Sequence, residues 1–389
     1  MGRSRRHPAI SSHSVPSICE RSRLHIRLAG LDAFRLAKVS LWEDVAWPCL
    51  SLMILDAQMS SRDATQEGDP SRRTKRMPSD SVTCGDRETI SIVIVTFQSL
   101  RLVDDCLKSL MAHGPKLLDA SVHVVDNASS DGTIAHIRAH FPWVNIYPRS
   151  TNDGFSVANN AALREIRDDF VLILNPDTRF ESNAIDPLYE RLRADASVGM
   201  IGCRLLQEDG TFDHAAKRTF PSPTSAMTHA LPSRLGISST YTAPDVAETG
   251  SGYVDAINGA FMFIKREALD AVGLFDEAYW MYGEDLDLAK RFQLASWRVW
   301  YEGSVSVRHV KGGVSGKWRR TGLNYQFHKS MAIYYRKFHS GRSVIVDTTV
   351  YVGIAVKFFV SAIISVSRRR IPLLAPVASS GSSRKDEIY

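Results

Sequence analysis

The stretch Phe170-Val-Leu-Ile-Leu-Asn-Pro-Asp177 decides the fold of this chain. A short run of branched apolar residues that stops at a proline predicts a buried strand of a parallel sheet. In open α/β sheets, ligands bind just beyond the carboxyl ends of such strands. Asp177 therefore offers a hard oxygen ligand to a divalent cation that holds a diphosphate. The alternative is a simple turn, which would be the favoured interpretation of an isolated Asn-Pro-Asp triplet.

Three more segments predict strands that end in polar residues, and each is followed by a helical pattern. The strands, with the residues at or after their ends, are 89–96 with Thr96 and Phe97, 122–125 with Asp126 and Asn127, and 144–147 with Asn152 and Gly154. Strands that alternate with helices of this length predict βαβ units. We therefore expect an α/β fold with a mostly parallel, doubly wound sheet and flanking helices. The polar residues where the strands end outline a nucleotide site.

Five motifs that occur in order carry a resemblance to a known family. They are Val95-Thr96-Phe97, the run from Val125 to Thr133, Asn152-Asp153-Gly154-Phe155, Asn175-Pro176-Asp177, and the run from Gly283 to Leu288. Together they resemble the family 2 glycosyltransferases, and among these the subgroup similar to bacterial rhamnosyltransferases, over residues 89–338. Each motif alone is weak because Asp-Gly and Asn-Gly pairs mark turns in many proteins, so the specificity lies in the ordered set. The resemblance implies a GT-A-type nucleotide-diphospho-sugar transferase fold.

Four residues are candidates for contacts with the base of a nucleotide-sugar donor. Asp126 and Asn127 can meet the ring nitrogen and carbonyls of a pyrimidine, and the resemblance implies that they are the base contacts. An Asx turn would explain the same pair, and Asn127 can serve both purposes. Thr96 and Phe97 offer a hydroxyl and a ring face to the same base.

Four further residues are expected near the rest of the donor. By resemblance, Asn152 and Gly154 lie near the ribose and the phosphates. Asn175 is placed to orient Asp177 or to contact the ribose. Residues 254–264 predict another buried strand, and Gly259 within it lacks bulk, which lets the backbone approach the donor sugar.

Asp177 and His309 are the predicted metal ligands. A lone histidine is more often structural, but His309 stands in a Gly-rich segment after a predicted strand over residues 299–301. Imidazole, carboxylate and diphosphate oxygens together suit Mn²⁺ or Mg²⁺, and Mn²⁺ tolerates the nitrogen better. Many members of the family carry two acidic residues where this chain has Asn175-Pro176-Asp177 and keeps only the second. This departure matches the rhamnosyltransferase-like subgroup.

Glu284 and Asp285 begin a predicted helix, where carboxylates often serve only to complement the helix dipole. They follow the aromatic run Tyr279-Trp280-Met281-Tyr282, a candidate platform for a sugar or an acceptor. By resemblance, Asp285 is the catalytic base and Glu284 is a neighbour that positions the acceptor or the base. A base at this place implies direct displacement with inversion at the anomeric carbon and no covalent enzyme intermediate.

The sequence divides into a catalytic domain, residues 89–338, and two appendages. Residues 1–88 predict a partly disordered extension, because residues 58–86 are rich in Ser, Arg, Asp and Thr and have little to bury. Within the domain, the long Pro-, Ser- and Thr-rich stretch 211–252 predicts a lid or an excursion that faces the acceptor. Residues 339–389 predict a hydrophobic helix followed by a basic tail.

The apolar stretch 344–366 is long enough to span a bilayer. Asp347 and Lys357 interrupt it, and a charge in hydrocarbon is costly. Arg368-Arg369-Arg370 would orient a spanning helix with its carboxyl end in the cytoplasm, which conflicts with a cytoplasmic catalytic domain. We therefore expect a protein that is peripheral to, or anchored at, the inner face of the cell membrane. A helix that simply packs on the domain is the alternative.

The predicted function is inverting, metal-dependent transfer of a sugar from a nucleoside-diphosphate donor to a glycan or lipid-linked acceptor in cell-surface polysaccharide synthesis, with rhamnose as the candidate sugar. The net charge of +6 is too small and too dispersed to indicate a nucleic-acid partner, and five scattered cysteines indicate reduced thiols. A nucleotidyltransferase would need a Gly-rich phosphate loop that residues 96–101 do not provide. A non-catalytic nucleotide-sugar-binding protein is disfavoured by the intact set Asp177, Asp285 and His309.

Overall fold

A computed structural model describes residues 74–78, 87–221, 242–310, 321–341 and 343–370. The chain divides into two units, Met1–Gly68 and Asp69–Tyr389, and the first lies wholly outside the described residues. The predictions for residues 1–73, for the basic tail after Arg370 and for the middle of the 211–252 stretch also lie outside them.

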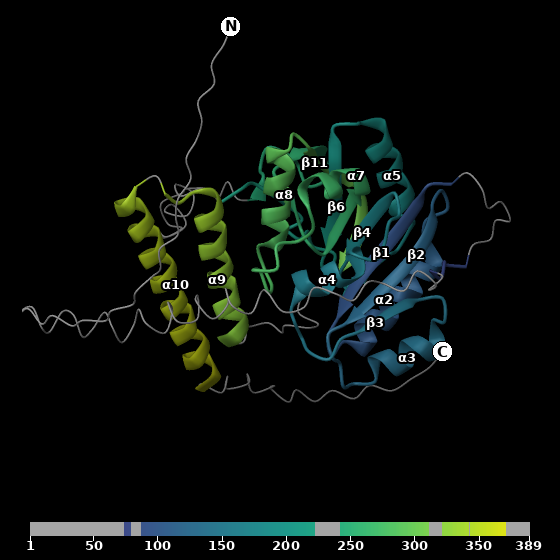
Figure 1. The fold of residues 1–389 in the computed structure, drawn as a ribbon, viewed down its shortest axis with the longest axis horizontal. Helices are drawn as coiled ribbons and strands as arrows, with labels where there is room; N and C mark the ends of the chain where they lie inside the picture. The colour runs from purple at the N-terminus through teal and green to yellow at the C-terminus, as the bar shows by residue number, and fades with distance from the viewer. Residues whose placement is uncertain (1–73, 79–86, 222–241, 311–320, 342, 371–389) are drawn as a thin grey trace, which may run out of the picture. The chain divides into compact units, whose positions relative to one another are not determined.

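The described residues form a nine-stranded sheet in the order β3-β2-β1-β4-β10-β6-β11-β5, with β8 beside β11, and a two-stranded sheet of β7 and β9 (Figure 1). The strands are β1 Thr89–Thr96, β2 Asp119–Asp126, β3 Asn145–Pro148, β4 Phe170–Leu174, β5 Thr178–Arg179, β6 Val198–Leu206, β7 Lys217–Arg218, β8 Ser251–Val254, β9 Ala256–Ile257, β10 Phe261–Lys265 and β11 Arg298–His309. The helices are α2 Leu100–His113, α3 Thr133–His140, α4 Phe155–Leu163, α5 Ile185–Ala194, α7 Arg266–Val272, α8 Glu284–Leu294, α9 Thr321–Phe338 and α10 Val344–Arg370.

Helices cover both faces of the large sheet, as predicted for a doubly wound fold. Side chains of a strand alternate between faces, so Ile92 and Ile94 of β1 join one core cluster and Val93 joins the other. The first cluster includes the apolar faces of α2, α3 and α5, and the second those of α4, α7 and α8. Both faces of the sheet are therefore shielded from water, and this is why the sequences of β1 and β4 are almost continuously apolar.

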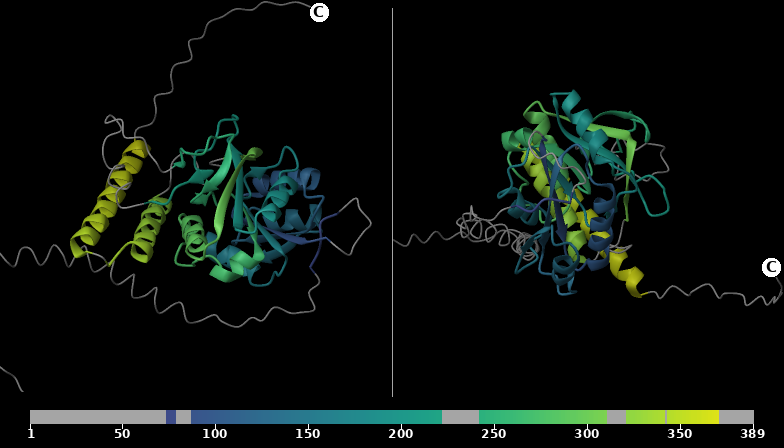
Figure 2. Two further views of the ribbon diagram at one scale, coloured as in Figure 1. Left: turned by 90° about the horizontal axis from the view of Figure 1, so that it is seen from above. Right: turned by 90° about the vertical axis from the view of Figure 1, so that its right-hand side faces the viewer.

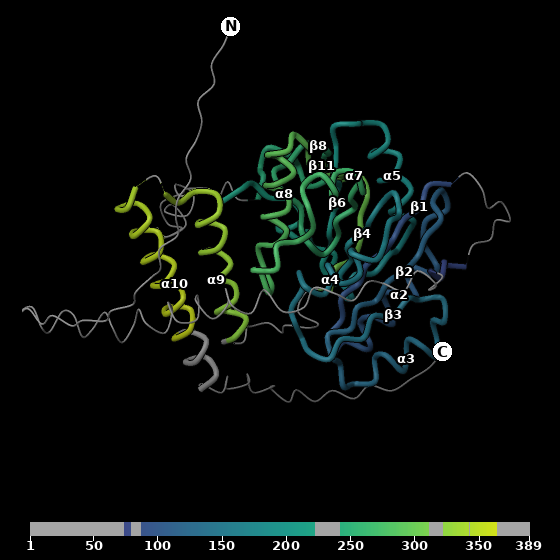
Figure 3. Tube along the Cα trace, viewed as in Figure 1, coloured from purple at the N-terminus to yellow at the C-terminus, as the bar shows by residue number. Residues whose placement is uncertain are grey.

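The sheet is parallel in its first half and mixed in its second. β1 pairs in parallel with β2 and β4, whereas β10 lies antiparallel between β4 and β6. Figure 3 shows the early strands β1 to β3 grouped together and the later strands β6, β8 and β11 beyond β4. Because β10 is antiparallel, its first residue Phe261 pairs with Leu174, the last residue of β4. The turn before β10 therefore arrives where β1, β2 and β4 end.

Two strand boundaries differ from the predictions. The strand predicted over residues 254–264 is broken after β9 because the Asn258 side chain accepts a hydrogen bond from Ala260 N (2.9 Å) and forms a turn. The strand predicted over residues 299–301 is longer, since β11 continues through a register shift to His309. His309 is thus held by a strand rather than by a loop.

Residues 74–78, within the stretch 58–86 that was expected to have little to bury, pack on the domain. Met77 N donates a hydrogen bond to Ala120 O (2.8 Å). The guanidinium of Arg76 pairs with Asp168 (3.0 Å) and with Asp119 (3.5 Å). A short apolar and basic segment can therefore pack on a domain even when the sequence around it is polar.

Helices α9 and α10 lie side by side, with α9 between α10 and the sheet domain (Figure 2). Lys337 of α9 bonds to Asp276 (2.6 Å) and Asp287 (2.7 Å), which ties α9 to the domain. Tyr335 of α9 donates to Asp347 of α10 (2.7 Å). The segment Val344–Ile363 of α10 has a mean hydropathy of 1.7, none of it is buried, and it is long and apolar enough to cross a membrane.

Candidate active site

The carboxyl end of β2 presents two buried side chains with unused oxygens. Asp126 accepts a hydrogen bond from Ser129 N at Oδ2 (2.9 Å), and its Oδ1 has no hydrogen-bond partner. Asn127 donates from Nδ2 to Gly154 O (3.1 Å), and its Oδ1 also has no partner. The Asp126 bond spans three residues rather than the two of the expected Asx turn. Buried polar atoms are nearly always bonded, so the two unused oxygens are acceptors that fit the donor groups of a ligand.

The loop before α4 is fitted to its surroundings through Gly154. Gly154 has φ +89°, and a Cβ there would stand 2.2 Å from Trp280 O, so only glycine is tolerated. Asn152 Oδ1 accepts from Gly154 N (3.2 Å), and Trp280 Nε1 donates to Asn152 O (3.4 Å). Of the aromatic run considered as a platform, Tyr279 is fully buried, whereas Trp280 packs on Gly154 and stays partly exposed, as does Tyr282.

Thr96 and Phe97 differ in what they offer. The Thr96 hydroxyl is buried and shares a hydrogen bond with Ser99 Oγ (2.5 Å), so it is already engaged within the protein. Phe97 keeps 37% of its surface exposed at the end of β1. The ring of Phe97 is therefore available to a base, whereas the hydroxyl of Thr96 is not.

Backbone bonds bring the ends of β4, β10 and β11 together. Asn175 N donates to Ala260 O (3.0 Å), and Val310 N donates to Asp177 O (2.8 Å). Asp177 Oδ1 is buried, has no hydrogen-bond partner by geometry among the described residues, and lies 3.4 Å from His309 Nε2, an ion-pair distance. The two predicted metal ligands, 132 positions apart (309 − 177), are therefore neighbours.

Asp213 completes this cluster, and sequence reasoning missed it. Its Oδ2 lies 3.3 Å from His309 Nδ1, and its side chain is 1% exposed. A carboxylate only accepts hydrogen bonds, so Nδ1 of His309 carries the donated proton. Burial alone would lower the pKa of His309, but Asp177 and Asp213 on either side outweigh it and raise the pKa to about 9. The only signal in the sequence was a carboxylate after Gly210-Thr211-Phe212 in a stretch predicted as a loop.

The side chains at this cluster fit a divalent cation. No group of three or more His, Cys, Asp or Glu side chains with metal-site geometry exists among the residues that the structure describes. Asp177 Oδ1 and His309 Nε2 supply one oxygen and one nitrogen, which lie 3.4 Å apart. Two carboxylates favour positive charge here, and a diphosphate would supply the remaining ligands. A histidine that gives its second N–H to a carboxylate is the usual arrangement around protein-bound metals.

Glu284 and Asp285 begin α8 after two residues with left-handed backbone, Tyr282 (φ 73°) and Gly283 (φ 83°). For a bulky residue this conformation costs about 1–2 kcal/mol, and such strain concentrates at functional sites. Asp285 Oδ2 accepts from Gly259 N (3.1 Å), so the predicted close approach at Gly259 is first of all to this carboxylate.

The two neighbouring carboxyl groups differ in their surroundings. Asp285 also accepts from Leu286 N (2.8 Å) and from Arg218 (2.5 Å). Glu284 is buried, and its Oε2 has no hydrogen-bond partner. Burial and the charge of Asp285 raise the pKa of Glu284 to about 8. The surroundings of Glu284 therefore favour its protonated form more than those of an exposed glutamate do.

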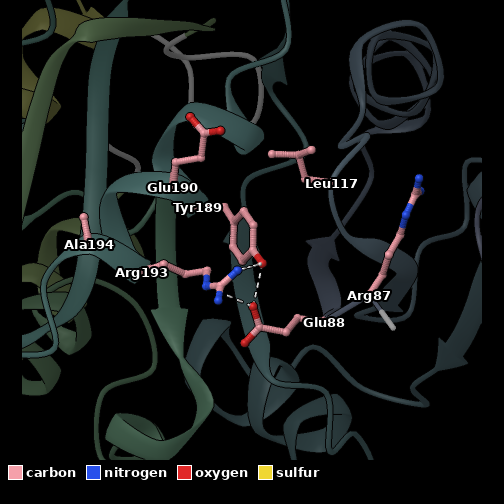
Figure 4. Close-up of a pocket in the computed structure, with 7 residues that line it drawn as sticks. All are labelled: Arg87, Glu88, Leu117, Tyr189, Glu190, Arg193 and Ala194. Atoms are coloured by element: carbon pink, nitrogen blue, oxygen red, sulfur yellow. Dashed lines mark hydrogen bonds and ion pairs between the residues drawn. The ribbon is translucent and has the colours of Figure 1, made fainter. Parts of the chain in front are cut away.

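A surface pocket elsewhere is a separate feature. It is lined by Glu88, Tyr189 and Arg193 among others, and their polar ends bond to one another (Figure 4). Tyr189 donates to Glu88 (2.5 Å), and Arg193 donates to Tyr189 (3.2 Å). Glu88 precedes β1, so this pocket lies at the amino end of the strand, opposite the cluster of candidate residues.

The ordered set of motifs is thus gathered where the parallel strands end. Residues 91–270 match the sequence profile of glycosyl transferase family 2. Residues 91–270 therefore form a domain of this family. This glycosyltransferase is 28% identical over 268 residues to the N-acetylglucosaminyl-diphospho-decaprenol L-rhamnosyltransferase of Mycobacterium tuberculosis. The alignment covers 65% of this chain and 86% of that protein. It is 27% identical over 163 residues to a rhamnosyltransferase of Escherichia coli, covering 40% of this chain and 60% of that protein.

Among solved structures, this glycosyltransferase resembles a mannosyltransferase of Pyrobaculum calidifontis in complex with GDP-Man and Mn²⁺. The TM-score is 0.47 and the sequence identity 16%, over 89% of this chain and 87% of that one. The doubly wound sheet with flanking helices, predicted from the strand and helix pattern, agrees with the family assignment.

Proposed function

We propose that this glycosyltransferase moves a sugar, with rhamnose as the candidate, from a nucleoside-diphosphate donor to a lipid-linked acceptor, with inversion and with the help of a divalent cation. The proposal is carried by the Asp177–His309 pair where β4 and β11 end, together with the Glu284–Asp285 pair, which bonds to the turn before β10. The rhamnosyltransferase names of the two relatives support the sugar, and the diphospho-decaprenol name of one supports the class of acceptor.

The donor nucleotide would bind where β1 and β2 end. The unbonded oxygens of Asp126 and Asn127 accept hydrogen bonds from a base, and Phe97 offers its ring face. Asn152 and Gly154 sit one step further along this edge, towards the ribose and phosphates. Asn175 is held by Ala260 and lies next to Asp177, so it serves the ribose side of the diphosphate.

Asp177 and His309 would hold Mn²⁺ or Mg²⁺ against the diphosphate. When bound, the cation neutralises the charge that develops on the departing nucleoside diphosphate. Asp213 fixes the His309 ring, so that Nε2 and Asp177 Oδ1 face the same point. Their roles are therefore binding and orientation of the leaving group.

Asp285 is the proposed base. The acceptor hydroxyl oxygen forms a bond to the anomeric carbon, the bond from that carbon to the diphosphate oxygen breaks, and the hydroxyl proton passes to the Asp285 carboxylate. The electron pair leaves with the diphosphate. Because attack and departure occur on opposite faces of the sugar, the configuration inverts. Burial and the charge of Asp285 raise the pKa of Glu284, and its protonated form can donate a hydrogen bond to the acceptor or the donor sugar.

Helix α10 supports a location at the inner face of the cell membrane. Its contacts with α9 run through Asp347, Tyr351 and Phe358. The other side is apolar and exposed, formed by Val352, Val356, Phe359 and Ile363. These four residues recur every three or four positions, which defines one stripe along a helix. We propose that this stripe enters the bilayer interface and brings the active site to a lipid-linked acceptor.

Release of nucleoside diphosphate from a panel of donor sugars, with and without a polyprenyl-diphosphate-linked sugar, tests the proposal. We expect acceptor-dependent release with one or few donors, loss in excess chelator, and recovery with Mn²⁺ or Mg²⁺. The product should have the opposite anomeric configuration to the donor. Full activity in excess chelator would contradict the role given to Asp177 and His309.

A further inference from the structure

Arg218 reaches the Glu284–Asp285 pair from a part of the chain in which sequence reasoning found no site residue. It belongs to β7, which pairs antiparallel with β9 and places Arg218 opposite Ala256. Its Nη2 donates to Ile257 O (2.6 Å) and to Asp285 Oδ2. Arg218 is thus fixed to the strand before the Gly259 turn and to the first turn of α8.

The Arg218–Asp285 ion pair is buried at both ends. The two side chains are 9% and 10% exposed. Removing two charges from water costs several kcal/mol per ion, so a buried ion pair is a poor device for stability compared with apolar packing. A buried ion pair that includes the proposed catalytic base is therefore expected to have a role in the reaction.

The partners of the two carboxyl groups are unequal. Asp285 accepts hydrogen bonds from Arg218, Gly259 N and Leu286 N. Glu284 Oε2 is buried without a partner, and the ionisable groups that act on it are Asp285 and Arg218. Two adjacent buried carboxyl groups cannot both ionise freely and tend to share one proton. The guanidinium beside Asp285 settles which of them keeps the charge.

We propose that Arg218 is a positioning residue that pairs with the Asp285 carboxylate, favours its charged form and aims it at the acceptor hydroxyl. The inference rests on the proposed role of Asp285 as base. Arg218 and Gly259 occupy Oδ2, whereas within the described ranges Oδ1 accepts one bond, from Leu286 N, and keeps a lone pair for the incoming proton. Without the guanidinium, the single charge would be shared by the two carboxyl groups, and Asp285 would be protonated for part of the time.

The test compares Arg218→Met, Arg218→Lys and the matched control Lys217→Met. Lys217 is the other residue of β7, is also buried, and bonds to Thr242 O (3.0 Å) and Ala243 O (2.7 Å) rather than to Asp285. The pH profile of kcat/KM is recorded for each variant together with donor affinity by calorimetry. In Arg218→Met we expect the acid limb to move up by at least about one pH unit, with at least about a tenfold loss near pH 6 and partial recovery at high pH. Arg218→Lys should restore most of the profile, and donor affinity should stay within about threefold of wild type.

A purely structural role predicts a different result. Lys217→Met and Arg218→Met would then lower activity by the same factor at every pH, without rescue by lysine, and this outcome would overturn the inference. A second readout separates it from the proposed function. Carboxyl infrared or ¹³C titration, with Asp285→Asn to assign the signal, should show Asp285 titrating at higher pH in Arg218→Met than in wild type. If that shift is seen in a protein without transferase activity, the inference holds and the proposed function fails. If the shift is absent in a protein that has transferase activity, the inference fails and the proposed function holds.

Discussion

Asp213 Oδ2 and His309 Nδ1 lie 3.3 Å apart, which joins the end of β11 to a segment 96 residues earlier in the chain. Asp213 is itself fixed, since its Oδ1 accepts from Ala215 N (2.9 Å) and its backbone N donates to Leu205 O (2.9 Å). The imidazole is therefore oriented by a carboxylate that cannot rotate freely. Asp213 therefore supports the proposed metal site, although it belongs to none of the sequence motifs.

Asp213→Asn should weaken Mn²⁺ binding about 10- to 100-fold, the usual cost of removing the carboxylate that orients a metal-bound histidine. Mn²⁺ titration by electron paramagnetic resonance in the presence of nucleoside diphosphate measures this directly. Asp209→Asn is the matched control, because Asp209 lies in the same turn and bonds only within it, to Thr211 (2.6 Å). Equal affinities of wild type and Asp213→Asn would rule out the orienting role.

Asp285→Asn should reduce turnover by at least roughly 10²-fold, because the substitution removes the proton acceptor and keeps the shape of the side chain. An amide oxygen can still accept bonds from Gly259 N, so the turn beside the donor sugar is retained. Donor affinity, measured by calorimetry, is expected to change little. Loss of donor binding with unchanged kcat would make Asp285 a binding residue instead.

Asp287, two positions further on, should behave in the opposite way. It is fully buried and pairs with Arg291 (2.7 Å) and Lys337 (2.7 Å), so it links α8 to α9 rather than facing substrate. Asp287→Asn leaves two cations near an uncharged side chain, and breaking a buried pair costs about 3 kcal/mol or more. Denaturant unfolding should show this loss, while turnover per folded molecule stays near wild type. Asp276→Asn, which shares Lys337 at a half-exposed position, should cost about 1 kcal/mol or less.

The strand pattern and the motifs were predictable because each depends on local sequence. β1 and β4 are apolar runs, and the residues that follow them must lie at one edge of a parallel sheet. Asp213, Arg218 and the antiparallel insertion of β10 were not predictable, because they depend on how a long irregular segment returns to the sheet. Two-residue strands such as β7 and β9 carry no periodic signal. The packing of Arg76 was not predictable either, because it too depends on how an irregular segment returns to the sheet.

Arg76→Met should lower the free energy of unfolding by about 1–2 kcal/mol at neutral pH, because it removes the charged partner of a mostly buried carboxylate. Burial alone would raise the pKa of Asp168, but hydrogen bonds from Ser91 and Arg76 outweigh it and hold the pKa below its usual 3.8. A carboxyl group whose pKa is lower in the folded state stabilises the protein above its unfolded pKa and loses that effect as pH falls.

The difference between wild type and Arg76→Met should therefore be constant from neutral pH to about pH 5 and shrink below pH 3.8. Urea unfolding across this range measures it. A chain that begins at Ser81 should lose at least this increment, because it also lacks the Met77 N bond to Ala120 O, whereas one that begins at Ser71 should not. A difference that grows as pH falls would contradict the assignment to Asp168.

The full chain should bind anionic vesicles through the exposed stripe of α10. Val356 and Phe359 are 54% and 57% exposed, and burying such side chains in the interface is favourable by about 1.5–3 kcal/mol each. The arginines 368–370 add about 1 kcal/mol each near an anionic surface. Val356→Glu combined with Phe359→Glu should abolish flotation with the vesicles. The matched control is the double variant Ser361→Ala with Thr349→Ala, which removes hydroxyls of α10 that bond to Asn324 (2.9 Å) and to Ile345 O (2.8 Å). This variant leaves the stripe intact and should still float with the vesicles. Equal melting temperatures would show that the charged variant is folded, and a wild-type chain that stays with the soluble fraction would make α10 a helix that serves packing on α9 alone.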